Sequence, residues 1–303
     1  MSRFSRVFVA LLSCVLVVAM AAAQEQVTRP PITGIARIQI FVTNVAAARD
    51  FYEKTLRLPP VTSDCSTELA ACLMVNAHQQ VQLVAAPSPV PTNLIAKIAF
   101  ATTDVARMRQ YLVSKGLAPN DIGVDAHHEQ HFSLHDPEGH VVSFVQLSAS
   151  AASGKVSGQT SAALIHAGWI FRDREAADRF YKDILGFHLY WHGGMKDDET
   201  SWVAMQVPDG TDWLEYMLNI PSDASHHTIG VMNHISLGVT DIKATKEQLV
   251  KNGWKVSEEP KLGRDGKWQL NLYDPDDTRV EFMEFKPVAK PCCSEYTGTQ
   301  PGP

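Results

Sequence analysis

The sequence predicts an α+β protein that repeats one unit of a strand, a helix and about three further strands four times. Three observations support this prediction. Apolar runs with strand-like alternation accompany short segments with the three- and four-residue apolar spacing of helices. The order of these segments recurs along the chain. A stretch rich in Ser, Ala and Gly divides the units into two pairs, which indicates two domains.

The N-terminal residues predict a secretion signal. Arg3 and Arg6 precede an apolar stretch from Val7 to Met20, and three alanines before Gln24 offer a small-residue cleavage site. We therefore expect residues 1–23 to be a signal peptide and the mature protein to be exported, to the periplasm or outside the cell. The stretch is short for a retained membrane span, and no later segment is long and apolar enough for one.

The first two units predict an N-terminal domain over residues 32–148. One unit runs from residue 35 to about 86 and the other from 94 to 146, with helices expected at 46–56 and 105–115. The small, polar residues that follow predict a flexible linker over 149–161, because such compositions do not favour a fixed structure.

The last two units predict a C-terminal domain over residues 162–287. These units span 164–220 and 232–285, with helices expected at 174–185 and 242–252. In the first of these helices the apolar residues recur at steps of three and four, so one face is expected to pack on a sheet. The Pro- and Gly-rich residues 288–303 predict a flexible tail.

Two histidines and two glutamates occupy matching places in the last two units. His166 and His234 each open an apolar run that predicts a strand, and Glu215 and Glu281 each lie inside the last apolar run of their unit. A carboxylate within an apolar strand is costly to bury unless it is paired or bound to a metal. The pattern therefore predicts one metal site that draws two ligands from each unit.

Short motifs resemble those of a known group of proteins. Both pairs of units carry a Phe-Tyr helix ending and an Asp-Pro turn before the last strand: Phe51 to Leu56, Phe180 to Gly186, Asp136 to Gly139 and Asp274 to Asp277. The chain resembles the vicinal oxygen chelate superfamily, which includes glyoxalase I, bleomycin resistance proteins and extradiol dioxygenases. The resemblance covers nearly all of the expected mature chain. It implies tandem glyoxalase-like domains, each of two paired βαβββ modules that form a cup-shaped mixed sheet.

The resemblance also implies roles for individual residues. His166, Glu215, His234 and Glu281 match the family's metal ligands, with Glu215 as the expected catalytic base and Glu281 as the second choice. Imidazole and carboxylate ligands suit one divalent transition metal, which can be Zn, Ni, Fe, Co or Mn. The matching N-terminal positions hold no such ligands, so no metal is expected there: Arg37, Gln82, Lys97 and Ser143.

Aromatic residues gather in the middle strands of the C-terminal domain. These residues either pack in the core or line a pocket for an aromatic or apolar substrate: Tyr190, Trp191, His192, Trp202 and Trp268. Of these, Tyr190, His192, Trp202 and Trp268 are the expected substrate contacts. A small molecule is therefore the expected partner. The net charge of −6, without clustered Lys and Arg, does not suggest nucleic acid. Both a monomer and a homodimer remain open.

The expected function is that of an exported, metal-dependent, glyoxalase-like isomerase or lyase whose substrate chelates the metal through vicinal oxygens. Export disfavours glyoxalase I itself, because its usual thiol cosubstrate is cytosolic. One alternative is an extradiol-type dioxygenase of an aromatic diol. That alternative is weakened by Glu215 as an extra ligand and by Asn271 where a catalytic tyrosine is expected. The other alternative is a non-enzymatic small-molecule binding or resistance protein.

Four cysteines remain after the expected cleavage. Cys65 and Cys72 are close enough in sequence to form a disulfide in an oxidising compartment. Cys292 and Cys293 are adjacent, so they can form a crosslink to another chain, a vicinal disulfide or nothing at all.

Overall fold

The computed structural model describes residues 27–61, 65, 68–126, 128–148 and 157–303. The expected signal peptide and most of the expected linker lie outside these residues. Within the described part of the chain, no helix has both the length and the apolar character needed to cross a bilayer.

The first half of the chain forms one eight-stranded sheet. Its first module contains β1 (Ile32–Val42), a helix that begins as α1 (Val45–Arg49) and continues in wider turns (Asp50–Thr55), then β2 (Pro60–Val61), β3 (Ala71–Met74) and β4 (Gln80–Ala85). The second contains β5 (Ile95–Thr102), α2 (Val105–Ser114), β6 (Gly123–Val124), β7 (Gln130–His135) and β8 (Val141–Gln146). The strand order is β2-β3-β4-β1-β5-β8-β7-β6.

The second half repeats this arrangement. Its first module contains β9 (Leu164–Ile170), α3 (Arg174–Ala177) with wider turns to Ile184, β10 (His188–Gly193), β11 (Trp202–Gln206) and β12 (Trp213–Met217). After the short α4 (His226–Met232) come β13 (His234–Val239), α5 (Ile242–Lys251), β14 (Lys261–Leu262), β15 (Trp268–Tyr273) and β16 (Arg279–Glu284). The order is β10-β11-β12-β9-β13-β16-β15-β14.

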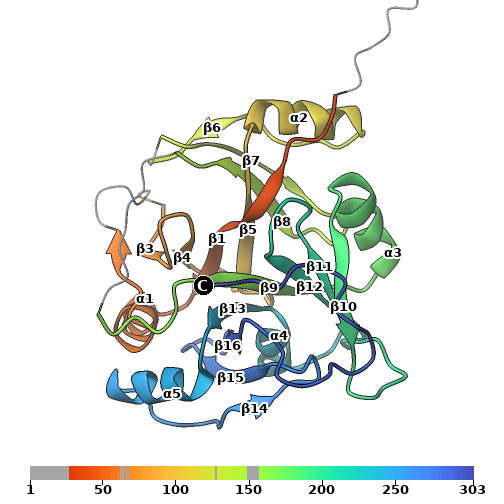
Figure 1. Ribbon diagram of the computed structural model, residues 1–303. Helices are drawn as coiled ribbons and strands as arrows, with labels where there is room; N and C mark the ends of the chain where they lie inside the picture. The colour runs from red at the N-terminus through yellow and green to blue at the C-terminus, as the bar shows by residue number, and fades with distance from the viewer. Residues whose placement is uncertain (1–26, 62–64, 66–67, 127, 149–156) are drawn as a thin grey trace, which may run out of the picture.

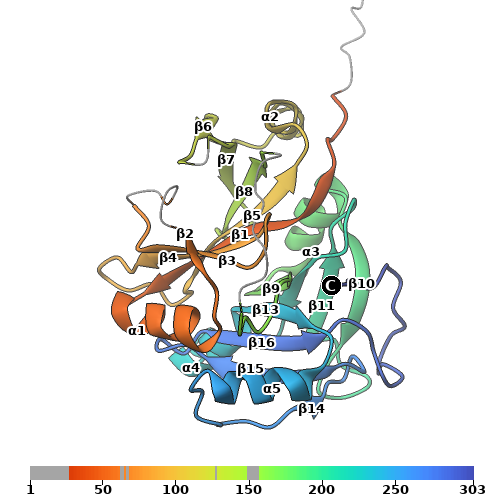
Figure 2. The same cartoon turned by 60° about the vertical axis from the view of Figure 1, so that its left-hand side comes forward.

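Both sheets are mixed and curled (Figures 1 and 2). In each, the first strands of the two modules pair antiparallel at the centre, and each first strand pairs parallel with the last strand of its own module. This is the expected arrangement of paired βαβββ modules in tandem cup-shaped sheets, and the fold prediction is confirmed.

Side-chain caps start the helices where the sequence places them. Asp104, Asp173 and Asp241 each accept a backbone N–H from the first turn that follows, as does Asn44. Gly186 ends the third-module helix with φ of +80°, a left-handed conformation that glycine adopts without a Cβ clash. Polar residues therefore fix the points where the chain changes direction between sheet and helix.

The family-like motifs join the two halves of the molecule. The hydroxyl of Tyr52 donates to Asp274 Oδ2 at 3.1 Å, and the hydroxyl of Tyr181 donates to Asp136 Oδ2 at 2.9 Å. Each Asp also forms its own turn, because its other oxygen accepts backbone N–H groups. Each Phe-Tyr helix is thus bonded to the Asp-Pro turn of the other half. One hydrophobic core runs through both sheets.

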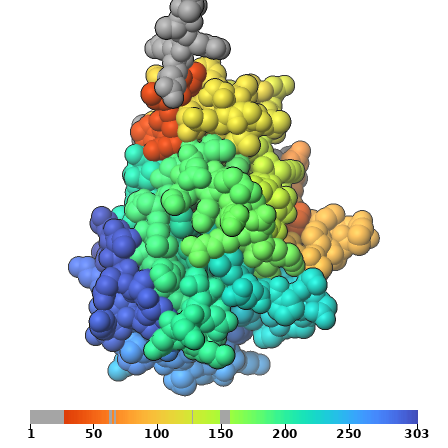
Figure 3. Space-filling view, turned by 90° about the vertical axis from the view of Figure 1, so that its right-hand side faces the viewer, coloured from red at the N-terminus to blue at the C-terminus, as the bar shows by residue number. Residues whose placement is uncertain are grey.

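Two segments that the sequence predicts to be flexible make specific contacts in the structure. At the end of the expected linker, Gln159, Thr160 and Ser161 are buried and bond to backbone carbonyls of both halves. The expected flexible tail, residues 288–303, packs along β10, with Thr297 N–H bonded to Tyr190 O at 3.0 Å. Figure 3 shows this tail in dark blue on the surface. Composition predicts flexibility, but here side chains supply specific contacts.

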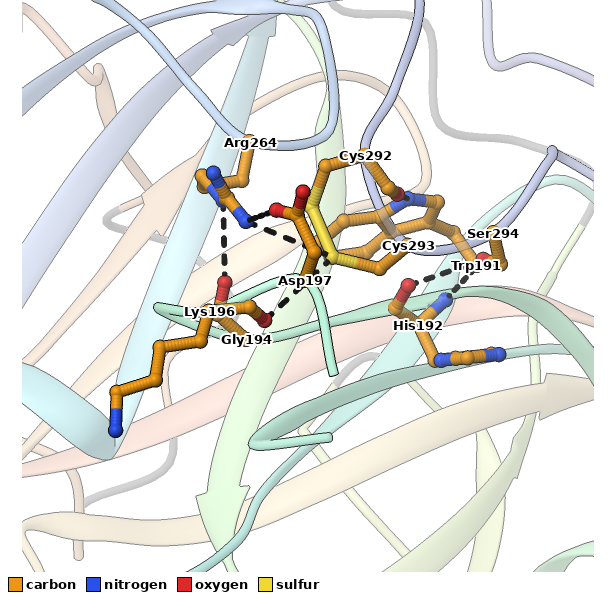
Figure 4. The surroundings of a disulfide bond; sticks show 9 residues. All are labelled: Trp191, His192, Gly194, Lys196, Asp197, Arg264, Cys292, Cys293 and Ser294. Carbon is orange, nitrogen blue, oxygen red and sulfur yellow. Dashed lines mark hydrogen bonds and ion pairs between the residues drawn. A yellow bond between two sulfur atoms is a disulfide. The ribbon is translucent and has the colours of Figure 1, made fainter. Parts of the chain in front are cut away.

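The described residues form two disulfides. Cys65 bonds to Cys72, and Cys292 bonds to its neighbour Cys293. Figure 4 shows the vicinal disulfide beside Trp191, whose indole N–H donates to Cys292 O at 3.2 Å. Of the possibilities left open for the adjacent pair, the structure has the vicinal disulfide. It lies where the tail meets the edge strand β10.

Candidate metal centre

Four adjacent strands at the centre of the second sheet bring the two histidines and two glutamates together. The strand order there is β12-β9-β13-β16, and these strands carry Glu215, His166, His234 and Glu281 respectively. The ladder pairs Gly168 with both Glu215 and His234, and Ser236 with both His166 and Glu281. Residues paired in a ladder face the same side, so all four side chains point into one cup.

A glycine makes room for one of these rings. A Cβ at Gly168 would lie 2.2 Å from His234 Cε1 and 2.3 Å from its Nδ1, far inside contact distance. The same position in the first sheet is Gln39, which pairs with Lys97 and Gln82. Only the second sheet therefore has the space for the imidazole at this point.

The donor atoms lie close to one another. The Nε2 atoms of His166 and His234 are 3.0 Å apart. Glu281 Oε2 lies 3.2 Å from His166 Nε2, and Glu215 Oε2 lies 3.3 Å from His234 Nε2 and 3.9 Å from His166 Nε2. The ligand atoms of His166, Glu215 and His234 all lie within 4.8 Å of one another. The structure thus places every sequence-predicted ligand in one cluster.

Burial keeps the histidines in the form that binds metal. It lowers the pKa of His166, and it lowers that of His234 to about 3, to which the positive charge of Arg279 also contributes. A hydrogen bond between His234 Nδ1 and Met232 O, 2.9 Å long, directs Nε2 of this ring into the cluster. A neutral imidazole with its free nitrogen toward the other donors is ready to coordinate.

The two glutamates differ in electrostatic environment. Burial raises the pKa of Glu215, opposed by the nearby His166. For Glu281 burial acts in the same direction, but the hydrogen bond with His166 and the charge of Arg279 outweigh it and lower its pKa to about 2. Glu281 therefore stays ionised to lower pH, and Glu215 is the carboxylate that takes up a proton more readily.

This donor set fits a divalent transition metal. The two Nε2 atoms are 3.0 Å apart on one side of the sheet, so both imidazoles would hold the same ion. Two imidazoles and two carboxylates are also a donor set that such ions accept. A buried carboxylate beside each imidazole supplies the negative charge that a divalent ion would neutralise.

The cup opens into a cavity of about 350 Å³. Glu215 and Glu281 form part of its floor, and its walls are largely aromatic and Met side chains: Tyr190, Trp191, Trp202, Trp213, Tyr296, Met195, Met217, Met232 and Met283. Such a lining suits a small ligand with an apolar or aromatic body.

Of the four residues expected to bind substrate, the structure places two in the cavity lining and two elsewhere. Tyr190 and Trp202 line the cavity, whereas His192 and Trp268 do not. A register shift in β10 between Leu189 and Trp191 disturbs the alternation of side chains, so that Tyr190 and Trp191 both reach the cavity. Trp268 packs instead against the core behind the sheet.

Several cavity residues were not predicted as substrate contacts from the sequence. Trp213 stacks on His166 with ring centroids 4.5 Å apart, and Asn271 pairs directly with Glu281 in the ladder. Arg279 pairs with His234. The two-residue alternation about Glu215 and Glu281 is the signal that places Trp213 and Arg279 on the cup face. No comparable signal indicates Tyr296, which comes from the tail.

A buried lysine lies behind this wall. Lys267 is fully shielded from solvent, and its Nζ donates to the Tyr190 hydroxyl at 3.2 Å. The same atom lies 5.1 Å from the centre of the Trp213 ring and 5.2 Å from that of Tyr296, which are cation–π distances. Burial lowers its pKa to about 8, although Asp265 opposes this shift. The tail thus completes an aromatic cage next to the metal-ligand cluster.

The first sheet has a cup of similar shape but different chemistry. In its ladder Gln39 pairs with both Gln82 and Lys97, and Ala99 pairs with both Arg37 and Ser143. These pairings match those of the metal-ligand cluster in the second sheet. The sequence alignment of the two halves is therefore correct at each position. The cavity there measures about 310 Å³. Arg37 is held in ion pairs with Asp125 and Glu129, so this cup is a salt-bridged, polar copy of the other.

Comparison with known proteins agrees with the fold. Lactoylglutathione lyase of Haemophilus influenzae is 28% identical over 116 residues, which cover 38% of this chain and 86% of the relative. A probable chloroplastic lactoylglutathione lyase of Arabidopsis thaliana is 25% identical over 134 residues, 43% of this chain and only 38% of the relative. Each match therefore covers less than half of this chain.

Solved structures match over more of the chain. Homoprotocatechuate 2,3-dioxygenase of Brevibacterium fuscum superposes with a TM-score of 0.63 at 17% identity, covering 85% of this chain and 72% of the other. The enzyme of that name from Arthrobacter globiformis gives a TM-score of 0.63 at 17% identity, covering 84% and 80%. These matches show a shared fold.

The family comparison covers both halves separately. Residues 34–144 and 163–282 each match the family described as the Glyoxalase/Bleomycin resistance protein/Dioxygenase superfamily. The two matches coincide with the two sheets, and the second includes all four clustered His and Glu residues. The chain therefore belongs to the Glyoxalase/Bleomycin resistance protein/Dioxygenase superfamily, with two tandem domains of that family.

Proposed function

We propose that this protein is an exported, metal-dependent enzyme of the glyoxalase-like type, an isomerase or lyase of a small substrate with vicinal oxygens. One observation carries the proposal. The second cup holds two neutral histidines whose Nε2 atoms are 3.0 Å apart, and each of these atoms has a glutamate oxygen within 3.3 Å, beside a largely apolar cavity. The similarity to lactoylglutathione lyases supports the reaction class.

The residues have distinct roles in this proposal. His166, His234, Glu215 and Glu281 hold one divalent ion, whose chemistry when bound is to polarise the oxygens of the substrate. Glu215 moves the proton, because its raised pKa suits a group that must both take up and release one. Glu281 remains ionised as a permanent ligand. Trp191, Trp202 and Met217 exclude water from the reacting atoms.

Export is part of the proposal. The basic and apolar N-terminal pattern predicts a cleaved signal, and both disulfides suit an oxidising compartment. Purification from the native host and N-terminal sequencing of the mature protein test this part. A mature chain that still begins at Met1 in the cytosol would contradict it.

A dioxygenase is the second candidate, because the solved structures that match 84 to 85% of the chain are dioxygenases. Two features weigh against it. Glu215 is a fourth protein donor in a site that needs open positions for oxygen. Asn271 faces Glu281 where a catalytic tyrosine was expected, and the Tyr273 hydroxyl is bonded to Glu258 at 3.0 Å. A metal-free binding protein is disfavoured by the retained donor set.

One experiment separates these functions. The purified protein is loaded in turn with each candidate metal and incubated in heavy water with a panel of 2-hydroxy- and 2-oxocarbonyl compounds, while an oxygen electrode follows parallel reactions with catechols. We expect deuterium to enter the carbon next to a carbonyl group of at least one compound, without uptake of oxygen. Glu215→Gln should slow this exchange at least about 100-fold, the usual contribution of a general base.

The opposite outcomes are equally clear. Oxygen uptake with a catechol, and no deuterium exchange, would establish the dioxygenase. Neither activity with any metal would leave only the binding protein. Glu247→Gln is the matched control, because Glu247 is exposed on α5, lies outside the cavity lining and should not affect the exchange.

A further inference from the structure

Arg279 lies in the second cup with its guanidinium not hydrogen-bonded to any residue that the structure describes. It pairs with His234 in the ladder and precedes Glu281 by two residues, so its side chain faces the same cavity. Among the described residues its guanidinium forms no hydrogen bond or ion pair, and its Nε is shielded from solvent. A shielded donor group of this kind destabilises the protein if nothing bonds to it.

The other arginines at the two cups are all engaged. Arg264 lines the same cavity, but it is bonded to Asp197 and to Gly194 O, as Figure 4 shows. In the first cup, Arg37 bonds to Asp125 and Glu129. Arg279 therefore differs from them in presenting a free, planar donor group to the cavity.

Neutralisation of nearby acidic residues does not explain the positive charge of Arg279 in this cavity. Its charge does lower the pKa of Glu281 and His234. A divalent ion, however, would already neutralise Glu215 and Glu281. The charge of the guanidinium is then in surplus beside the metal, and a surplus positive charge in a small cavity attracts an anion.

A second polar side chain on the same side, that of Asn271, has an oxygen without a hydrogen bond in the described part of the chain. Asn271 is only 4% exposed and lines the cavity, and its Oδ1 has no hydrogen-bond partner among the described residues. Its Nδ2 reaches Glu258 only at 3.5 Å. Across the cup, the strands β10, β11 and β12 present the apolar side chains of Trp191, Trp202 and Met217. The cavity thus has one polar side and one apolar side.

We propose that Arg279 and Asn271 form a carboxylate-binding subsite, and that the substrate is a small organic acid with an apolar or aromatic body. The guanidinium binds the carboxylate through paired N–H donors, the geometry that Arg supplies best. The amide oxygen of Asn271 accepts a hydroxyl of the same ligand. This inference deepens the proposed function by naming its substrate class, but binding at the subsite does not itself require the metal.

The test compares matched acids and amides. Phenylacetate, phenylacetamide and mandelate are titrated into metal-free and zinc-loaded protein, and binding is followed by calorimetry and by the fluorescence of the cavity tryptophans. Zinc is used because it has no redox chemistry. In the zinc-loaded protein we expect phenylacetate to bind at least about 10-fold more tightly than phenylacetamide, as one charge-assisted contact allows. In the metal-free protein the preference for the acid should be smaller but still measurable, because Glu281 remains anionic there. Mandelate should bind more tightly still.

Variants assign the effect to residues. Arg279→Gln should abolish the preference for the acid, and Arg279→Lys should retain part of it. Arg264→Gln is the control and should keep the full preference. Asn271→Leu should remove only the advantage of mandelate over phenylacetate. If Arg279→Gln does not fold, as judged by circular dichroism, the Lys variant decides the comparison.

Several results would overturn the subsite. They are equal affinity for acid and amide, no binding of either to the wild type, and an unchanged preference in Arg279→Gln. Stronger binding of inorganic phosphate than of phenylacetate would assign a phosphate site instead. Failure of the protein to bind zinc would contradict the proposed function alone, because the metal-free titrations still test the subsite.

Discussion

At the scale of single residues, the cluster depends on ladder positions as well as on the ligands themselves. Gly168 separates Glu215 from His234, and Ser236 separates His166 from Glu281. The corresponding residues in the first sheet are Gln39 and Ala99. The second cup thus has room for two imidazoles. In the first cup, amide and cationic side chains occupy the equivalent space.

Gly168→Ala tests this dependence. The added methyl would meet the ring of His234 at 2.2 Å, so we expect the imidazole to move and metal affinity to fall at least about 10-fold, the lower end of the effect of disturbing a ligand's support. Competition with a chelating dye measures the affinity. Gly123→Ala is the control, because its Cβ would lie 3.4 Å from His131 in the other cup. Equal affinity in both variants would refute the steric argument.

At the scale of elements, the two Phe-Tyr helices join the domains through hydrogen bonds to buried Asp residues. Tyr52→Phe and Tyr181→Phe each leave a carboxylate oxygen without that donor. We expect each substitution to lower the free energy of unfolding by about 1–3 kcal/mol in urea denaturation.

The control for these substitutions is a tyrosine nearer the surface. Tyr273 also donates to a carboxylate, that of Glu258, but both residues are partly exposed. Tyr273→Phe should change the free energy of unfolding by less than about 0.5 kcal/mol. If all three variants lose a similar free energy of unfolding, the hydrogen bonds between the domains do not stabilise the protein more than a surface hydrogen bond does.

The sequence predicts the elements better than it predicts their exceptions. The four modules follow from apolar periodicity and N-cap residues, which are local signals. The equivalence of Lys97 with His234 follows from the repeat. The presence of Trp191 and not His192 in the cavity does not follow from the repeat, because a β-bulge depends on the partner strand. The packed tail is also beyond local signals, since Tyr296 finds its cage only in the folded protein.

At the scale of the whole molecule, a titratable group lies between the halves. Asp212 accepts the backbone N–H of Ile35 at 2.8 Å and the amide of Gln79 at 3.2 Å. Burial raises its pKa to about 7, although both hydrogen bonds oppose the shift. In the unfolded chain an Asp has a pKa of about 3.9. The folded state therefore favours the protonated form of Asp212.

The sign of the pH dependence follows. The contribution of Asp212 to stability is complete below pH about 4 and is lost as the pH rises through about 7. Asp274, whose pKa burial raises to about 6, acts in the same direction. We expect the free energy of unfolding to decline between pH 5 and 8, and to decline less in Asp212→Asn. Identical slopes in urea titrations of the two proteins would contradict this assignment.

The molecule as a whole contains one scaffold twice, with a predicted metal site in only one copy. Elemental analysis of the purified protein, reconstituted with each candidate metal, tests this claim most directly. We predict one tightly bound transition metal per chain, lost in His234→Ala and unchanged in Lys97→Ala, the equivalent substitution in the first cup. A wild-type chain that retains no metal, or one whose metal survives His234→Ala, would contradict the account.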